Sequence, residues 1–264
     1  AMPVAARAML HQWEEPCLVG EHGAGTVFFS GCNLRCCFCQ NQPISRGGVG
    51  KAITPERLRQ IFRELIDQGA ACLDLVTPTH FTPAILEALG DEVWPVPVVW
   101  NCGGYEDPEM LRQLEGKVQV YLPDLKYALP GPARRYSGAE DYFQWASAAI
   151  LEMFRQTGPY VMENGQLKRG VLIRHLLLPG EMENTRRCID FVAEHFRPGE
   201  VLFSLMSQYT PQPGAEGNLR RHVTRAEYRA AVAYMENCGI TDGYTQERTS
   251  AKEEYTPDFD GRGV

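Results

Sequence analysis

Six short apolar segments alternate with amphipathic segments along the chain, and this alternation limits the fold more than any other feature of the sequence. Each apolar segment is rich in β-branched residues and ends at glycine, proline or polar residues, as buried strands do. The predicted strands cover residues 26–30, 72–76, 96–100, 118–122, 171–177 and 201–205. Because strands that alternate with helices build a parallel sheet with crossover helices, we expect an α/β fold.

Six βα units predict an open partial (β/α)6 TIM-type barrel of parallel strands. A complete eight-unit barrel takes about 250 residues, which would leave none for the long insert at 130–169. A doubly wound open sheet is the alternative. In both folds the reactive groups lie at the carboxyl ends of the strands, so the residues just after each strand are the candidates for the site.

The length of 264 residues, 44% of them hydrophobic, suits one domain. We expect a single domain at 1–239, with a helical insert after the fourth strand. That insert contains a helix near 142–157 and a polar turn at Glu163, Asn164 and Gly165. The polar stretch 240–264 lacks periodicity, and we expect an irregular C-terminal tail that packs on or near the barrel.

Charge and hydropathy exclude several classes of partner. The chain has 26 Lys and Arg against 33 Asp and Glu and no basic block, so we expect no binding of nucleic acid. No apolar run approaches the roughly 20 residues needed to cross a bilayer, and the first residues lack the pattern of an export signal. We therefore expect no membrane association and a cytoplasmic location. Four of the nine cysteines lie within residues 32–39, which favours metal chemistry over disulfides.

Three of these cysteines, Cys32, Cys36 and Cys39, have the spacing C-x3-C-x2-C directly after the first predicted strand. Soft thiolates on one short loop can bind three irons of a [4Fe-4S] cluster. The fourth iron then stays open to a cofactor, and with S-adenosylmethionine (SAM) this permits reductive cleavage to an adenosyl radical. Zinc would need a fourth ligand, which the sequence near the loop does not supply.

The segment resembles the radical SAM superfamily, whose signature is this spacing with an aromatic residue, here Phe38, before the last cysteine. Its flanks at 25–31 and 40–41, and blocks that follow the later strands, are similar to the pyruvate formate-lyase activating enzyme-like branch. The closest likeness is to the uncharacterised activating-enzyme-like subgroup, over nearly the whole chain. The resemblance implies a [4Fe-4S] cluster held by the three spaced cysteines, with Cys37 as a non-ligand, and SAM as cofactor.

The resemblance also implies contacts to SAM at the ends of successive strands. The activating enzymes bind the methionyl amine with Gly-Gly-Glu after their second strand, where this chain has Thr77, Pro78 and Thr79. Carbonyl and hydroxyl groups would then replace a carboxylate. An ordinary turn that caps the next helix is the alternative. His80 follows, and we expect it to contact adenine or substrate, with a structural position at the helix start as the alternative.

Further predicted SAM-binding residues follow the other strands or flank the cysteines. Asp124 and Lys126 match an Asp-Leu-Lys segment whose Asp, in the activating enzymes, helps to hold a cation beside the SAM carboxylate. Asn101 stands where those enzymes have an acidic partner, so a monovalent cation is an option rather than a requirement. A solvated ion pair is the alternative for Asp124 and Lys126. The remaining residues of the set are Phe38, Asn41, Arg174, Met206 and Gln208. For Met206, a position in the hydrophobic core is the alternative.

The catalytic candidates are Arg174, His175 and Cys102. Arg174 and His175 are adjacent in a strand, so one points into the barrel and the other outward. Arginine binds anions and histidine moves protons near neutral pH, whereas a buried histidine is often only a hydrogen-bonded core residue. A thiol at Cys102 would return a hydrogen atom to a substrate radical, as radical epimerases do; a small buried core residue is the alternative.

The sequence therefore predicts a radical SAM oxidoreductase that resembles the activases of glycyl radical enzymes. The implied partners are an electron donor such as flavodoxin or ferredoxin and a glycyl radical enzyme or peptide substrate. Two alternatives stay open: radical modification or epimerisation of a peptide or small molecule, and a non-catalytic iron-sulfur protein that transfers electrons or senses redox state.

Overall fold

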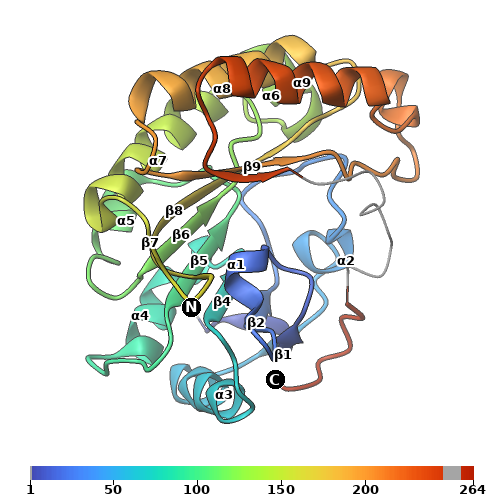
Figure 1. Cartoon of the computed structure of the whole chain (residues 1–264). Coiled ribbons are helices and arrows are strands. Elements are labelled where there is room, and N and C mark those ends of the chain that lie inside the picture. Colours follow the sequence, from blue (N-terminus) through green and yellow to red (C-terminus); the bar gives the residue numbers. More distant parts are fainter. Residues whose placement is uncertain (1, 246–256) are drawn as a thin grey trace.

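A computed structural model describes residues 2–245 and 257–264. The strands in this part of the chain form one ten-stranded sheet (Figure 1). The strand order is β10-β9-β8-β6-β5-β4-β2-β1-β3, and β7 pairs with β8. Their bounds are β1 Val4–His11, β2 Ala24–Phe29, β3 Lys51–Ala52, β4 Leu73–Val76, β5 Val98–Cys102, β6 Val120–Pro123, β7 Val161–Glu163, β8 Gln166–Leu176, β9 Leu202–Met206 and β10 Gly243–Thr245.

The strands from β2 to β10 along this order are parallel, while β1 pairs antiparallel with β2 and β3. β10 and β3 end the sheet without pairing to each other, so the barrel stays open. The predicted open partial barrel with a helical insert is confirmed, and the doubly wound alternative is wrong. Each predicted strand overlaps an observed strand, but the sequence pattern did not predict β1, β3 or β7.

Helices α3 to α9 lie along the outer side of the sheet, whereas the short α1 lies on its inner side (Figure 1). The helix bounds are α1 Pro16–Val19, α2 Gln42–Ser45, α3 Pro55–Asp67, α4 Thr82–Leu89, α5 Pro108–Arg112, α6 Pro130–Ser137, α7 Tyr142–Thr157, α8 Met182–His195 and α9 Arg225–Asn237. Two 3-10 turns are η1 Thr79–Phe81 and η2 Gly217–Arg220. No helix in the described part of the chain is long and apolar enough to span a membrane.

Local sequence signals account for the crossover helices. At α3 the Thr54 side chain accepts a hydrogen bond from the Arg57 backbone N–H at 3.2 Å, and Pro55 occupies the first turn. The helix buries an apolar stripe formed by Leu58, Ile61, Phe62 and Leu65. Such stripes pack on the outer face of the sheet and leave the inner face for the site.

The stretch predicted to be an irregular tail contains a strand. β10 pairs in parallel with β9, and its polar sequence is explained by its position at the exposed edge of the sheet. Residues 257–264 pack along β1: the backbone N–H of Ala8 donates to the Arg262 carbonyl at 3.1 Å, and Arg7 pairs with Asp260. The part of the predicted tail at 246–256 lies outside the described residues. The division into a domain at 1–239 and a tail stays a prediction.

Candidate functional site

The inner face of the barrel changes from apolar to polar toward the carboxyl ends of the strands. Near the amino ends the strands pack on α1 in a closed apolar layer made by Cys17, Leu18, Ala24, Cys72, Val99, Val120, Leu172 and Leu202. Two residues further along, the same face has the buried polar side chains of Thr26, Asp74, Asn101 and Ser204, together with Arg174, whose side chain is 15% exposed. This follows from the two-residue period of a strand, and it builds a polar floor beneath the open end of the barrel.

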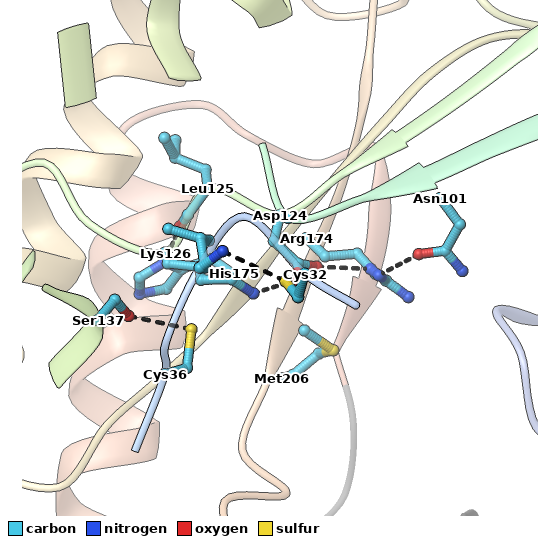
Figure 2. Close-up of polar contacts among 12 residues, drawn as sticks. Cys32, Cys36, Asn101, Asp124, Leu125, Lys126, Ser137, Arg174, His175 and Met206 are labelled. Carbon is cyan, nitrogen blue, oxygen red and sulfur yellow. Dashed lines mark hydrogen bonds and ion pairs between the residues drawn. The ribbon is translucent and has the colours of Figure 1, made fainter. Parts of the chain in front are cut away.

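Arg174 lies at the centre of this polar floor and joins three other elements (Figure 2). Its Nε donates to Asp124 Oδ1 at 2.9 Å, its Nη1 to Glu14 Oε1 at 3.0 Å, and its Nη2 to Asn101 Oδ1 at 2.7 Å. Asn101 Nδ2 in turn donates to the other Glu14 oxygen at 3.0 Å. The guanidinium therefore forms ion pairs with two carboxylates and fixes the amide of Asn101.

Asp124 is bound by two cations, because Lys126 Nζ donates to its Oδ2 while Arg174 holds Oδ1. Burial raises the pKa of Asp124, but the charges of Arg174 and Lys126 outweigh burial and hold that pKa below its ordinary value. Arg174 lies beside Asp124, where the sequence allowed a bound monovalent cation. Since both oxygens are already paired with positive charge, no further cation is needed to neutralise this carboxylate.

The cysteine loop follows β2 and is tied to the helical insert. Gly31 has a left-handed φ of +90°, and a Cβ there would lie 2.8 Å from His80 Nε2, so only glycine suits this turn. The backbone N–H of Cys37 donates to the Tyr136 carbonyl of α6 at 2.8 Å. The Cys37 side chain is exposed, whereas Cys36 is buried and lines a pocket together with Cys39.

Each of the three spaced thiols has a polar neighbour. Ser137 Oγ donates to Cys36 Sγ at 3.0 Å, the Leu34 backbone N–H donates to Cys32 Sγ at 3.4 Å, and Ser45 Oγ lies 3.6 Å from Cys39 Sγ. Burial raises the pKa of Cys32 to about 11 and also raises that of Cys36. A bound metal overcomes such a shift, because it keeps a coordinating thiol deprotonated.

This arrangement fits an iron-sulfur cluster better than a single metal ion. All nine cysteines are free thiols, and among the described residues no three His, Cys, Asp or Glu side chains converge on one ion. Zinc would require such convergence, whereas each thiolate of a [4Fe-4S] cluster binds a different iron. The donor set on this loop therefore suits the predicted cluster.

Two adjoining pockets occupy the open end of the barrel. One, of about 250 Å³, lies against the cysteine loop and is also lined by Phe38, Asp124 and Lys126. The other, of about 180 Å³, lies over the polar floor and is lined by Glu14, Glu15 and Asn101. Both include Gln40, Asn41, Arg174, Met206 and Gln208. Most of the predicted cofactor-binding residues therefore surround one continuous space.

The predicted segment after the second strand lies beside this space without lining either pocket. Thr77 has φ of +58°, an outlier for a β-branched residue. Thr79 Oγ1 donates to Glu106 Oε1 at 2.6 Å, and His80 Nε2 lies 2.7 Å from the Ser30 carbonyl oxygen. His80 therefore supports the start of the cysteine loop, while Thr79 is bound to Glu106. Their contact with SAM stays a prediction.

Two of the three catalytic candidates face away from the pockets. Asn101 and Arg174 point into the barrel, so their chain neighbours Cys102 and His175 point outward, as the strand period requires. His175 is fully buried against α8, with Nδ1 2.6 Å from the Leu125 carbonyl and Nε2 2.9 Å from Thr185 Oγ1. Cys102 is part of the core cluster beneath the helices. Both positions match the structural alternatives given for these residues.

The sequence did not indicate Glu14, Glu15 and Asp74, which lie in or beside the polar floor; Glu15 and Asp74 are buried, and the Glu14 side chain is 11% exposed. Burial raises the pKa of Glu15 to about 7, and it also raises that of Asp74. Asp74 could have been predicted from the sequence, because a charged residue in the middle of an apolar strand needs a polar neighbour inside the fold. Glu14 and Glu15 could not, since they lie in a loop far from the cysteines in sequence.

The buried carboxyl of Glu106 predicts a pH dependence of stability. Burial raises its pKa from 4.5 to about 7, although hydrogen bonds from Thr79 and other groups oppose the shift. The carboxyl stabilises the fold in its protonated form, so we expect stability to fall by on the order of 3 kcal/mol as pH rises from about 4.5 through about 7. Glu106→Gln should remove this loss in urea unfolding curves. The exposed Glu183→Gln is the control, and equal pH profiles for Glu106→Gln and wild type would contradict the prediction.

A second prediction concerns the close approach at Gly104, whose φ is +79°. A Cβ there would overlap the Asp124 carbonyl oxygen and lie 2.7 Å from the Tyr142 hydroxyl, which donates to the same carbonyl at 2.6 Å. We expect Gly104→Ala to lower the free energy of unfolding by about 1–3 kcal/mol. Gly131→Ala, in the open first turn of α6, should be neutral or slightly stabilising. A Gly104→Ala protein as stable as Gly131→Ala would refute the steric argument.

Comparison with known proteins gives a matching cluster-domain model and structures of the same fold. Residues 19–113, which contain the cysteine loop, match the model of a 4Fe-4S single cluster domain. The fold is that of Streptococcus suis SuiB in its complex with S-adenosylmethionine, with a TM-score of 0.52 and 13% identity over 82% of this chain and 48% of SuiB. HydG, a maturase of the [FeFe]-hydrogenase, has a TM-score of 0.51 and 13% identity over 81% of this chain and 48% of HydG.

One curated relative matches at the level of sequence. An uncharacterized protein of Methanocaldococcus jannaschii is 29% identical over 243 residues, which are 88% of this chain and 66% of that protein. The chain therefore spans 66% of the length of that curated relative and about half the length of the two solved structures.

Proposed function

We propose that this chain, which has a 4Fe-4S domain within the radical SAM barrel fold, is a radical SAM enzyme. Cys32, Cys36 and Cys39 would hold a [4Fe-4S] cluster, and SAM would bind in the adjoining pockets. One observation carries the proposal: Cys36, Phe38 and Cys39 of the cysteine loop line the same pocket as Asp124, Lys126 and Arg174. An electron-transfer protein does not require a charged pocket beside its cluster.

The charged residues of the pocket suit the methionyl part of SAM. Lys126 Nζ has three donors and uses one of them on Asp124, so two can bind a carboxylate. Arg174 lines the same pocket, and its contacts with Asp124 and Asn101 fix its plane. Phe38 and Met206 offer apolar contact to an adenine ring. When bound, the reduced cluster supplies the electron that cleaves SAM to methionine and a 5'-deoxyadenosyl radical for hydrogen abstraction.

We further propose a peptide or protein substrate, with an activase-like abstraction of hydrogen from a glycine of a glycyl radical enzyme as the first candidate. The support is the sequence resemblance to the activating enzymes. Radical modification of a peptide is the second candidate, since SuiB, which shares the fold, has been solved with its precursor peptide SuiA. Epimerisation by Cys102 is less favoured, because its thiol lies in the core outside both pockets. Flavodoxin or ferredoxin is the proposed electron donor.

The proposed reaction is tested anaerobically. After the cluster is reconstituted and reduced with dithionite, SAM is added, and methionine and 5'-deoxyadenosine are quantified. We expect both products in equal amounts and a change in the EPR spectrum of the reduced cluster on addition of SAM. A protein that binds about four irons but whose EPR spectrum is unaffected by SAM would instead be an electron carrier.

A further inference from the structure

We infer that Tyr127 and Ser137 form a hydrogen-bond relay that raises the reduction potential of the cluster through Cys36. The inference rests on the proposed function only in that it needs the cluster at this loop. Tyr127 follows β6 and Ser137 ends α6, so the relay links the barrel and the helical insert to one cluster ligand.

The direction of the relay follows from its geometry. Ser137 Oγ lies 3.0 Å from Cys36 Sγ, and the Tyr127 hydroxyl lies 2.7 Å from Ser137 Oγ. A coordinating thiolate is only an acceptor, so the single Ser137 proton points to sulfur. The Tyr127 hydroxyl must then donate to Ser137. The Tyr127 side chain is fully buried and Ser137 is 4% exposed, so water does not compete for these groups.

Cys36 is distinguished from the other two ligands by this contact. The sulfur of Cys32 accepts a longer bond from the Leu34 backbone N–H at 3.4 Å, and Cys39 lies 3.6 Å from the Ser45 hydroxyl. Figure 2 shows Ser137 pointing at the Cys36 sulfur from the insert. The Cys36 thiolate therefore has the strongest donor of the three.

Hydrogen bonds to ligand sulfur tune the potential of an iron-sulfur cluster because reduction adds negative charge, part of which lies on the thiolates. A donor stabilises the reduced state more than the oxidised state. Because a hydroxyl that accepts a hydrogen bond is a better donor, Tyr127 strengthens the Ser137 contact. The relay thus makes the cluster easier to reduce, while leaving the number of iron ligands unchanged.

The test is a redox titration of the reconstituted full-length protein, followed by EPR. We expect Ser137→Ala to lower the equilibrium constant for one-electron reduction about tenfold, which corresponds to a potential lower by about 59 mV. Tyr127→Phe keeps the ring and the Ser137 contact, so its shift should have the same sign and be smaller. Ser137→Thr restores the hydroxyl and should restore the potential.

Tyr136→Phe is the matched control, because this neighbouring hydroxyl donates to Glu181 Oε1 at 2.6 Å and contacts no cysteine sulfur. Its potential should equal that of the wild type. Unchanged potentials in both Ser137→Ala and Tyr127→Phe would overturn the relay while leaving the proposed function intact. If Ser137→Ala does not bind iron, the reduction potential of Tyr127→Phe alone tests the relay. A wild-type protein that binds no cluster would refute the proposed function and the relay together.

Discussion

Replacing Cys32, Cys36 or Cys39 by alanine, one at a time, is expected to abolish both cluster binding and SAM cleavage. Each thiolate binds a different iron of a [4Fe-4S] cluster, so losing one leaves two irons without a protein ligand. Iron and sulfide should fall from about four of each per chain to well below one, and 5'-deoxyadenosine should fall to the level of the assay without enzyme.

Cys37→Ala is the control for these variants, since Cys37 lies in the same loop with an exposed side chain. The backbone N–H of Cys37 donates to the Tyr136 carbonyl of the insert, and alanine retains this bond. We expect normal iron content and product formation. A Cys36→Ala protein with four irons and an unchanged EPR spectrum would contradict the ligand assignment.

Removing the charge of Arg174 should cost the most stability of any single change at the polar floor. Arg174→Ala leaves the buried carboxylates of Glu14 and Asp124 without their shared cation; their side chains are only 11% and 18% exposed. Breaking a buried ion pair on one side costs about 3–5 kcal/mol, because an unpaired charge stays in the interior. We expect a loss of this size in the free energy of unfolding at pH 7, measured with urea, and loss of SAM cleavage.

The pH dependence of the stability of Arg174→Ala distinguishes the loss of the ion pairs from the loss of side-chain packing. Arg174 helps to hold the pKa of Asp124 below its ordinary value of 3.8, so its stabilisation is present above that pH and is lost as the carboxyl protonates. The Arg174→Ala defect should therefore shrink toward acid pH. Arg187→Ala, which removes an arginine 58% exposed and paired with Glu183, should cost about 0–1 kcal/mol. A defect at Arg174 no larger than this control, or equal at all pH values, would refute the argument.

Sequence patterns predicted the elements of the fold correctly where residues close together in the chain determine the element. Each of the six predicted segments overlaps a parallel strand, and Thr54 begins α3 as its N-cap signal indicates. The errors concern strands without a clear pattern: β1, β3 and β7 were not predicted, and β10 was assigned to an irregular tail. β3, β7 and β10 have only two or three residues, too few to show a hydrophobic period, and the alanine-rich β1 does not alternate regularly between apolar and polar residues.

The residues of the candidate site also fall into two groups: those that a local sequence pattern predicted and those that no local pattern predicted. The cysteine spacing is local, and it indicated the cluster loop without any knowledge of the fold. Glu14 is different, because its contact with Arg174 joins residues 160 positions apart in the chain, through a loop without a recognisable pattern. No signal in either segment alone could have paired them.

By itself, the sequence determined the alternation of strands and helices and the three thiols on one loop, because both depend on residues close together in the chain. Only the tertiary structure decided which side chain of each adjacent pair faces the site. The strand period shows that Arg174 and His175 point in opposite directions, but which one enters the barrel depends on the curvature of the sheet and on the helices that cover its outer face. As a result, Arg174 and Asn101 belong to the polar floor, whereas His175 and Cys102 lie in the core beneath the helices.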